Sequence, residues 1–117
     1  MAAALWLAVA SASAQPVTAP YDEHLNRLAE RLGAIHYLRN LCTEPTNEWR
    51  DQMSALLSAE QPQPARRARL IASFNKGYRS FDSVYIVCTD QARSAADRYV
   101  EEARQLASEL INTFGTQ

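Results

Sequence analysis

The sequence has little glycine, little cysteine and no excess of charge of either sign, and each shortage excludes a class of protein. Three glycines in 117 residues leave no glycine-rich loop to hold a phosphate or an oxyanion, so neither a nucleotide-binding loop nor a hydrolase nucleophile elbow is expected. A formal net charge of −1 argues against a general nucleic-acid binder, which normally carries a clear basic excess. The length is that of one domain.

Patterns for catalysis and metal binding are also missing. The only histidines, His24 and His36, have a spacing that matches no zinc-ligand pair. Glu101 and Glu102 are neighbours on an expected helix, so their side chains point about 100° apart and cannot face each other as an acid and a base. We therefore expect no metal, no cofactor and no enzymatic activity, and we expect His36 to be a hydrogen-bonded residue at the edge of the core.

The first fourteen residues predict a cleaved signal peptide. Residues 1–14 contain no charge, residues 2–10 form an apolar run, and residues 12–14, Ala-Ser-Ala, have the small-x-small pattern that a signal peptidase cleaves. The run is too short to span a membrane and no later segment is long enough, so the cleaved chain is not expected to be transmembrane. The usual basic start is missing, so either it lies upstream of Met1 or the signal is a weak one. The alternative to a signal peptide is a buried N-terminal helix.

Cleavage after residue 14 divides the chain into a signal peptide over 1–14, a flexible segment over 15–20 and one helical domain over 21–114. Such a leader predicts export to the periplasm, an oxidising compartment. There, an even number of widely spaced cysteines indicates a structural disulfide. Cys42 and Cys88 are the only two cysteines, and two buried free thiols are the alternative. Without a Cys-x-x-Cys pair, a thioredoxin-like motif is absent.

Apolar residues recur at steps of three and four through most of the domain, which predicts amphipathic helices that pack on one another. No strand-like alternation of any length is present. The predicted fold class is therefore all-α, a small four-helix bundle with a short second helix. The first helix is expected over 21–42, and the second is expected to begin at a Thr46 cap and to end at Gln61–Pro64. The third is expected from Pro64 to Cys88. The fourth is expected to begin at a Thr89 cap and to stop at Gly115.

A disulfide would join the C-terminal ends of the first and third helices, where Cys42 and Cys88 are expected. With short turns these two helices run parallel, so their C-terminal ends lie at the same pole. A disulfide requires Cα atoms about 4.4–6.8 Å apart, which forces the two helices together and displaces the short second helix to one side. Gly77, at the flank of the third-helix stripe, would allow this close approach; the alternative is a surface glycine.

Three segments resemble a known family. They are residues 32–39 (LGAIHYLR) followed by Leu41 and Cys42, residues 49–53 (WRDQM), and residues 74–81 (FNKGYRSF) with Tyr85 and Cys88. Together they are similar to a family of small exported alphaproteobacterial proteins with two well-separated cysteines, classed as a domain of unknown function. The resemblance covers residues 21–114. It implies a disulfide between Cys42 and Cys88 and a cell-envelope setting, and it implies no activity.

Two sets of polar residues on the third helix are candidate binding residues. Arg66, Arg69 and Lys76 project from the side opposite the apolar stripe and form a candidate face for an anionic partner. The alternative is a solvated face that attracts acidic residues of the fourth helix. Asn75 and Arg79, four positions apart beside the core, form a candidate recognition surface, or else they bond each other or a neighbouring helix end.

These observations predict a non-catalytic binding module of the periplasm or cell envelope, whose partner is an envelope protein or an anionic envelope polymer. The first alternative is a small periplasmic thiol-redox protein, or another enzyme, with Cys42 and Cys88 as a reversible pair. We disfavour it because Cys88 is expected within a buried aromatic stripe, and buried thiols are inert. The second alternative is a small-ligand carrier with a pocket between the helices, against which a tightly packed core would count.

Overall fold

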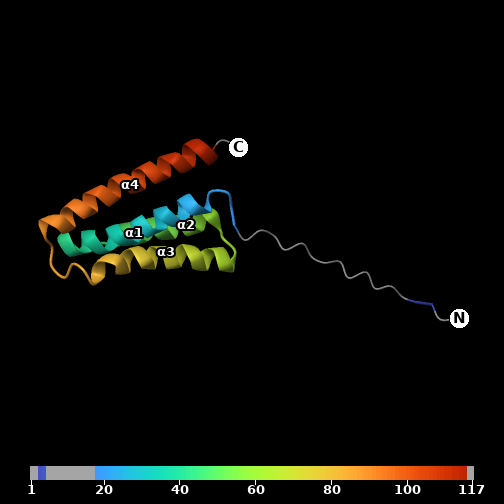
Figure 1. The fold of residues 1–117 in the computed structure, drawn as a ribbon, viewed down its shortest axis with the longest axis horizontal. Coiled ribbons are helices and arrows are strands. Elements are labelled where there is room, and N and C mark those ends of the chain that lie inside the picture. Colours follow the sequence, from blue (N-terminus) through green and yellow to red (C-terminus); the bar gives the residue numbers. More distant parts are fainter. Residues whose placement is uncertain (1–2, 5–17, 116–117) are drawn as a thin grey trace.

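The computed structural model describes residues 3–4 and 18–115. In this part the chain forms four α-helices and no strand, which confirms the predicted all-α fold (Figure 1). The helices are α1 (Asp22–Cys42), α2 (Glu48–Glu60), α3 (Pro64–Asp82) and α4 (Asp90–Phe114). The predicted signal peptide lies outside the described residues except at 3 and 4, and the predicted flexible segment is described only from residue 18.

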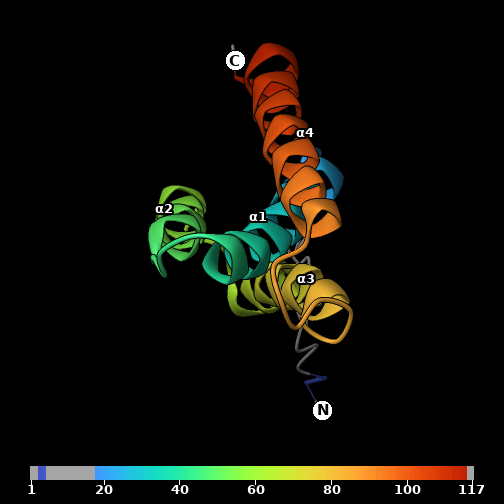
Figure 2. The ribbon, with the colours of Figure 1, turned by 90° about the vertical axis from the view of Figure 1, so that its left-hand side faces the viewer.

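Helix α1 is the central element, and each of the other three helices packs against it. Figure 1 shows α1 and α3 running in the same direction, as predicted, and Figure 2 shows α2, α3 and α4 on different sides of α1. The contact of α1 with α3 is the most extensive and that with α2 the smallest, while no two of the outer helices contact each other extensively. The fold is therefore three helices around one, with the short helix displaced to one side.

Two glycines bring the backbones of α1 and α3 into direct contact. Gly33 on α1 lies against the peptide group of Phe74, and Gly77 on α3 lies against the peptide group of Glu30. A Cβ atom added to either glycine would lie 2.8 Å from the carbonyl carbon that faces it. The expectation that Gly77 allows a close approach is confirmed. The matching role of Gly33 was not predicted.

Buried side chains form two clusters along α1. The first cluster joins α1 to α2 and α3 and contains Leu25, Ala29, Leu32, Met53 and Leu70. The second joins the C-terminal half of α1 to the first turns of α4 and contains Leu38, Ala92, Ala95 and Ala96. Because α4 contributes only alanines to the second cluster, its backbone approaches α1 closely there, and aromatic rings such as Phe81 and Tyr99 cover the edges.

Helix α3 ends at Asp82, so the prediction that the third helix continues to Cys88 is wrong. The segment between α3 and α4 contains three exposed β-branched residues, Val84, Ile86 and Val87. Such residues lose side-chain freedom in a helix, and here no burial offsets that loss. Cys88 has the sequence spacing of the apolar stripe but lies beyond the end of α3, which is why spacing alone misplaced it.

Other predicted helix ends are found close to where they were expected. The Thr89 side chain caps α4 by accepting a hydrogen bond of 3.1 Å from the backbone nitrogen of Ala92. Gly115 is the residue that ends α4. At the start of α2, the Thr46 hydroxyl accepts from the backbone nitrogen of Glu48 at 3.1 Å, although the helix itself begins one residue later than a Thr46 cap would place it.

Candidate functional site

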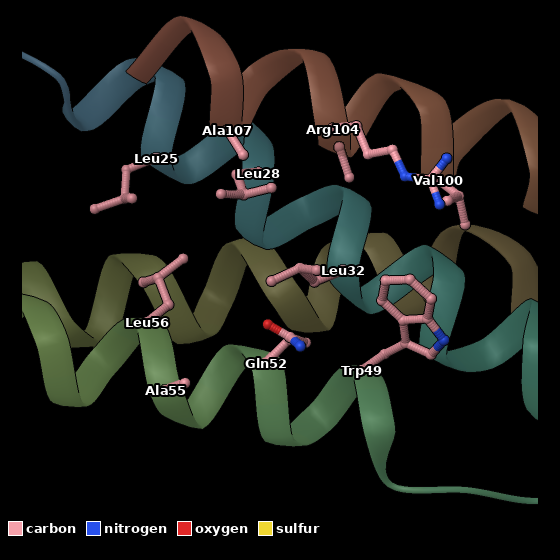
Figure 3. Close-up of a pocket in the computed structure, with 11 residues that line it drawn as sticks. Leu25, Leu28, Leu32, Trp49, Gln52, Ala55, Leu56, Val100, Arg104 and Ala107 are labelled. Carbon is pink, nitrogen blue, oxygen red and sulfur yellow. The ribbon is translucent and has the colours of Figure 1, made fainter. Parts of the chain in front are cut away.

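An open apolar groove lies between α2 and α4, and α1 forms its floor (Figure 3). Its volume is about 390 Å³. The three helices contribute residues at positions i, i+3 and i+7, which are Leu25, Leu28 and Leu32 of α1, Trp49, Gln52 and Leu56 of α2, and Val100, Ala103 and Ala107 of α4. Ala55 and Arg104 complete the lining. Seven residues of helix rise about 10 Å, so the groove extends over about two turns of each helix.

The groove contains few polar groups. Among its lining residues, only Gln52, Arg104 and the indole N–H of Trp49 offer polar side-chain groups. The Arg104 side chain is 76% exposed, and its Nη1 lies 3.8 Å from Oε2 of Glu101, a geometry in which an exposed ion pair contributes little. The sequence predicted the apolar face of α2 but not this groove, because periodicity does not tell which part of a face another helix covers.

A second cleft, of about 440 Å³, lies on another side of α2, between α2, α1 and α3. Five polar side chains line it, namely His36, Arg50, Ser54, Asn75 and Tyr78, together with the apolar residues Met53, Leu57, Ile71 and Phe74. All three segments that carried the family resemblance contribute to it. Of the predicted recognition pair, Asn75 lines this cleft and Arg79 does not. Within the described residues, Asn75 and Arg79 do not bond each other, which was one of the alternatives to a recognition surface.

His36 occupies the position at the edge of the core that was predicted for it. The side-chain amide of Asn40 donates to its Nδ1 at 3.3 Å, and its ring centre lies 5.9 Å from the rings of both Phe74 and Tyr78. Burial, and then the positive charge of Arg50, lower the pKa of His36. The imidazole is therefore held in its neutral form more firmly than an exposed histidine.

The predicted basic face of α3 is reduced by one member, because Arg66 is engaged inside the fold. Its side chain is 12% exposed, and its guanidinium donates to Asp22 at 2.8 Å and to Glu60 at 2.6 Å. Burial alone would lower the pKa of Arg66, but the hydrogen bonds with Glu60 and Asp22 outweigh it and raise the pKa. Arg66 is thus a structural residue. Arg69 and Lys76 are exposed, and their role toward an anionic partner stays a prediction.

Replacing Arg66 with glutamine is expected to lower the free energy of unfolding by about 2 kcal/mol, because two poorly exposed carboxylates lose their partner. The matched variant Arg67→Gln removes the same charge from an exposed neighbour and should change stability by less than about 0.5 kcal/mol. Urea unfolding of both variants measures the difference. Equal effects would show that the Arg66 ion pairs contribute nothing.

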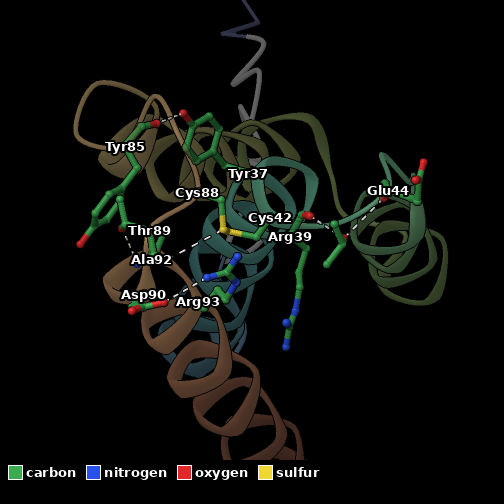
Figure 4. The surroundings of a disulfide bond; sticks show 11 residues. Tyr37, Arg39, Cys42, Glu44, Tyr85, Cys88, Thr89, Asp90, Ala92 and Arg93 are labelled. Carbon is green, nitrogen blue, oxygen red and sulfur yellow. Dashed lines mark hydrogen bonds and ion pairs between the residues drawn. A yellow bond between two sulfur atoms is a disulfide. The ribbon is translucent and has the colours of Figure 1, made fainter.

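Cys42 and Cys88 form the predicted disulfide, with their Cα atoms 4.9 Å apart (Figure 4). It joins the C-terminal end of α1 to the residue before the Thr89 cap of α4, and not to the end of α3 as predicted. The Tyr37 hydroxyl donates to the carbonyl oxygen of Tyr85 and holds the same segment on α1. Cys88 is partly exposed and lies outside the buried stripe, so burial does not argue against thiol exchange.

The described part of the chain contains neither a metal-binding cluster nor a helix that could span a membrane. Among residues 3–4 and 18–115, no three histidine, cysteine or acidic side chains are placed to hold a metal ion together. His24 lies apart from His36, with its Nε2 3.9 Å from Oε2 of Glu109. Within the same residues, no helix combines the length and apolar character needed to cross a membrane.

The chain matches a protein family, but it matches no curated protein and no solved structure. Residues 20–114 match a family described as "Protein of unknown function (DUF2385)". This match confirms the resemblance to a domain of unknown function, while export and an alphaproteobacterial range stay predictions.

Proposed function

Because the chain belongs to the DUF2385 family of proteins of unknown function, we propose a function from its own geometry. The protein is a non-catalytic binding module of the cell envelope that holds an amphipathic helix of a partner protein. The observation that carries this proposal is the open apolar groove between α2 and α4. The Cys42–Cys88 disulfide supports an oxidising compartment such as the periplasm.

The spacing of the lining residues favours a helix as the occupant. Each of α1, α2 and α4 presents positions i, i+3 and i+7 to the groove, which is the pattern of a helix surface that packs against another helix. A helix laid along the groove would bury its own residues at the same spacing, as in helix-in-groove recognition. The small side chains of Ala103 and Ala107 would let it approach the α4 wall closely.

Charge complementarity defines one flank of that partner helix. Arg104 is the only charged residue in the lining, and its side chain reaches from the α4 wall (Figure 3). An acidic residue beside the apolar face of the partner would pair with Arg104 better than Glu101 does at 3.8 Å. We therefore infer a partner helix with an apolar face and an acidic flank.

An apolar small molecule, such as a lipid acyl chain, is the competing occupant. A volume of about 390 Å³ falls in the range of small-molecule sites, roughly 300–1,000 Å³. The helices therefore leave room for a ligand, as the ligand-carrier alternative requires. The two occupants differ in what a crosslink from the groove captures, and this difference defines the experiment.

We expect a photocrosslinking amino acid in place of Ala107, inside the groove, to capture a helical segment of one envelope protein in living cells. The same amino acid in place of Ala68, exposed on α3, is the matched control and should not capture it. A synthetic peptide of the captured segment should bind the purified protein, and Ala107→Trp, which fills the groove, should weaken binding about tenfold or more. Ala68→Trp should leave binding unchanged.

Three results would contradict the proposal. Crosslinks from Ala107 to a lipid would make the protein a ligand carrier, and equal capture from positions 107 and 68 would mean that the groove is not the binding site.

Export is tested by the intact mass of the native protein, which should begin at Gln15 and show alkylation only after reduction. Two freely alkylated cysteines on a chain that still carries Met1 would overturn the cell-envelope setting.

A further inference from the structure

The cleft between α1, α2 and α3 gathers polar side chains that helix binding in the groove does not use. We propose that this cleft is a second binding site, and that it takes a small organic oxyanion, a carboxylate or a phosphate monoester carried on a partly apolar body. The proposal is independent of the groove, because the two sets of lining residues have no member in common.

The cleft favours an anion because its lining carries a net positive charge. Its lining contains one permanent cation, Arg50, and no carboxylate. Arg50 is exposed, and it makes no ion pair within the part of the chain that the structure describes. A guanidinium in this position offers a planar fork of N–H donors that matches a carboxylate or a phosphate with two parallel hydrogen bonds.

Uncharged donors from α2 and α3 line the cleft together with Arg50. Asn75 and Tyr78 lie three positions apart on α3 and so share one face of that helix. Ser54 lies one turn after Arg50 on α2. Within the described residues, none of these three side chains donates a hydrogen bond to the protein, so the amide and the two hydroxyls are available to a ligand.

The size and the apolar part of the lining indicate more than a bare ion. A cleft of about 440 Å³ leaves most of its space empty around a single phosphate or carboxylate, and it falls in the range of small-molecule sites. Phe74, Leu57 and Ile71 line the same space. They would contact a ring or a short alkyl chain attached to the oxyanion.

His36 reports on whether an anion is present. Burial and the charge of Arg50 on α2 lower the pKa of His36; Phe74 and Tyr78 face it from α3, and Asn40 bonds it on α1. None of these neighbours is a carboxylate. A bound anion would offset the charge of Arg50 and raise the pKa of His36. By linkage, the anion would bind more tightly as the pH falls and His36 becomes protonated.

The test is a titration of the full chain with phenyl phosphate and with phenylacetate, followed by the NMR signals of the His36 ring. We expect saturable shifts at millimolar concentrations, a raised pKa of His36 in the saturated protein, and no such effect from uncharged benzyl alcohol. Arg50→Gln should weaken binding about tenfold or more. The matched loss of charge in Arg67→Gln, which lies outside the lining, should not change it.

The source of the oxyanion is tested with vesicles. Phosphatidic acid vesicles that shift the His36 signals, when neutral phosphatidylcholine vesicles do not, would identify a lipid headgroup; shifts by the soluble probes alone would identify a free solute. No shift with either soluble probe, equal shifts with benzyl alcohol, or equal losses in Arg50→Gln and Arg67→Gln would overturn the proposal. Thermal unfolding of both variants confirms that they are folded. A failure here leaves the groove proposal standing, because its crosslinks come from Ala107 of α4, which does not line the cleft.

Discussion

Gly77→Ala is expected to lower the free energy of unfolding by about 4 kcal/mol, among the largest effects of a single substitution. The added Cβ would overlap the peptide group of Glu30, and a backbone group cannot move aside as a side chain can. The two helices would have to separate along their most extensive contact. In an exposed helix the same change would raise stability by about 1 kcal/mol, so the sign of the effect is itself the test.

Urea unfolding of the purified variant measures this effect. Ser80→Ala, on the exposed side of the same helix, is the control and should change stability by less than about 0.5 kcal/mol. Gly33→Ala, which meets the peptide group of Phe74, should cost about as much as Gly77→Ala. The double variant should cost less than the sum, because the same close crossing is lost only once. Stabilisation by either alanine would show that the helices do not touch here.

Replacing both Cys42 and Cys88 with serine is expected to lower the free energy of unfolding by about 4 kcal/mol. The disulfide closes a loop with a sequence separation of 46, and the chain-entropy relation gives about this value for a loop of that length. Most of the loss should arise in the unfolded state. The Thr89 cap and the hydrogen bond from Tyr37 to Tyr85 still hold the segment in the folded variant.

Urea unfolding of the oxidised protein, the reduced protein and the double serine variant separates these contributions. Reductant should destabilise the wild type by nearly the same amount as the substitutions, and it should not affect the variant. A loss below about 1 kcal/mol would argue against a structural disulfide. Because Cys88 is partly exposed, that result would favour the thiol-redox alternative over a permanent bond.

The helices were largely predictable from the sequence because their determinants are local. Apolar steps of three and four, Pro64 at the start of α3 and the Thr89 side chain at the start of α4 act within one or two turns. The clear error in the helix limits, the predicted end of the third helix at Cys88, also arose from a local pattern. Tyr85 and Cys88 continued the helical spacing past Asp82, and spacing alone did not reveal that the intervening aliphatic residues would be exposed.

The candidate sites were only partly predictable because they depend on how the helices are placed. Asn75 was predicted as a recognition residue and lines the cleft, but its predicted companion Arg79 does not. Arg66 was assigned to a basic face, whereas Asp22 and Glu60 neutralise it. Asp22 lies 44 residues away in the sequence, and Glu60 lies six residues away on the preceding helix. Nothing in the helical period of α3 indicates which carboxylates will meet Arg66.

Periodicity, capping and cysteine count predicted the helical class, four helices, most of their ends and the pairing of Cys42 with Cys88, because these signals do not require knowledge of distant contacts. Which helix faces remain open depends on how the helices pack, and this could not be predicted from these signals. The contact at Gly33 and Gly77 sets α3 against α1, while α2 and α4 pack on α1 without covering each other. The groove and the cleft on two sides of α2 follow from that placement, since each is lined by residues from three separate helices.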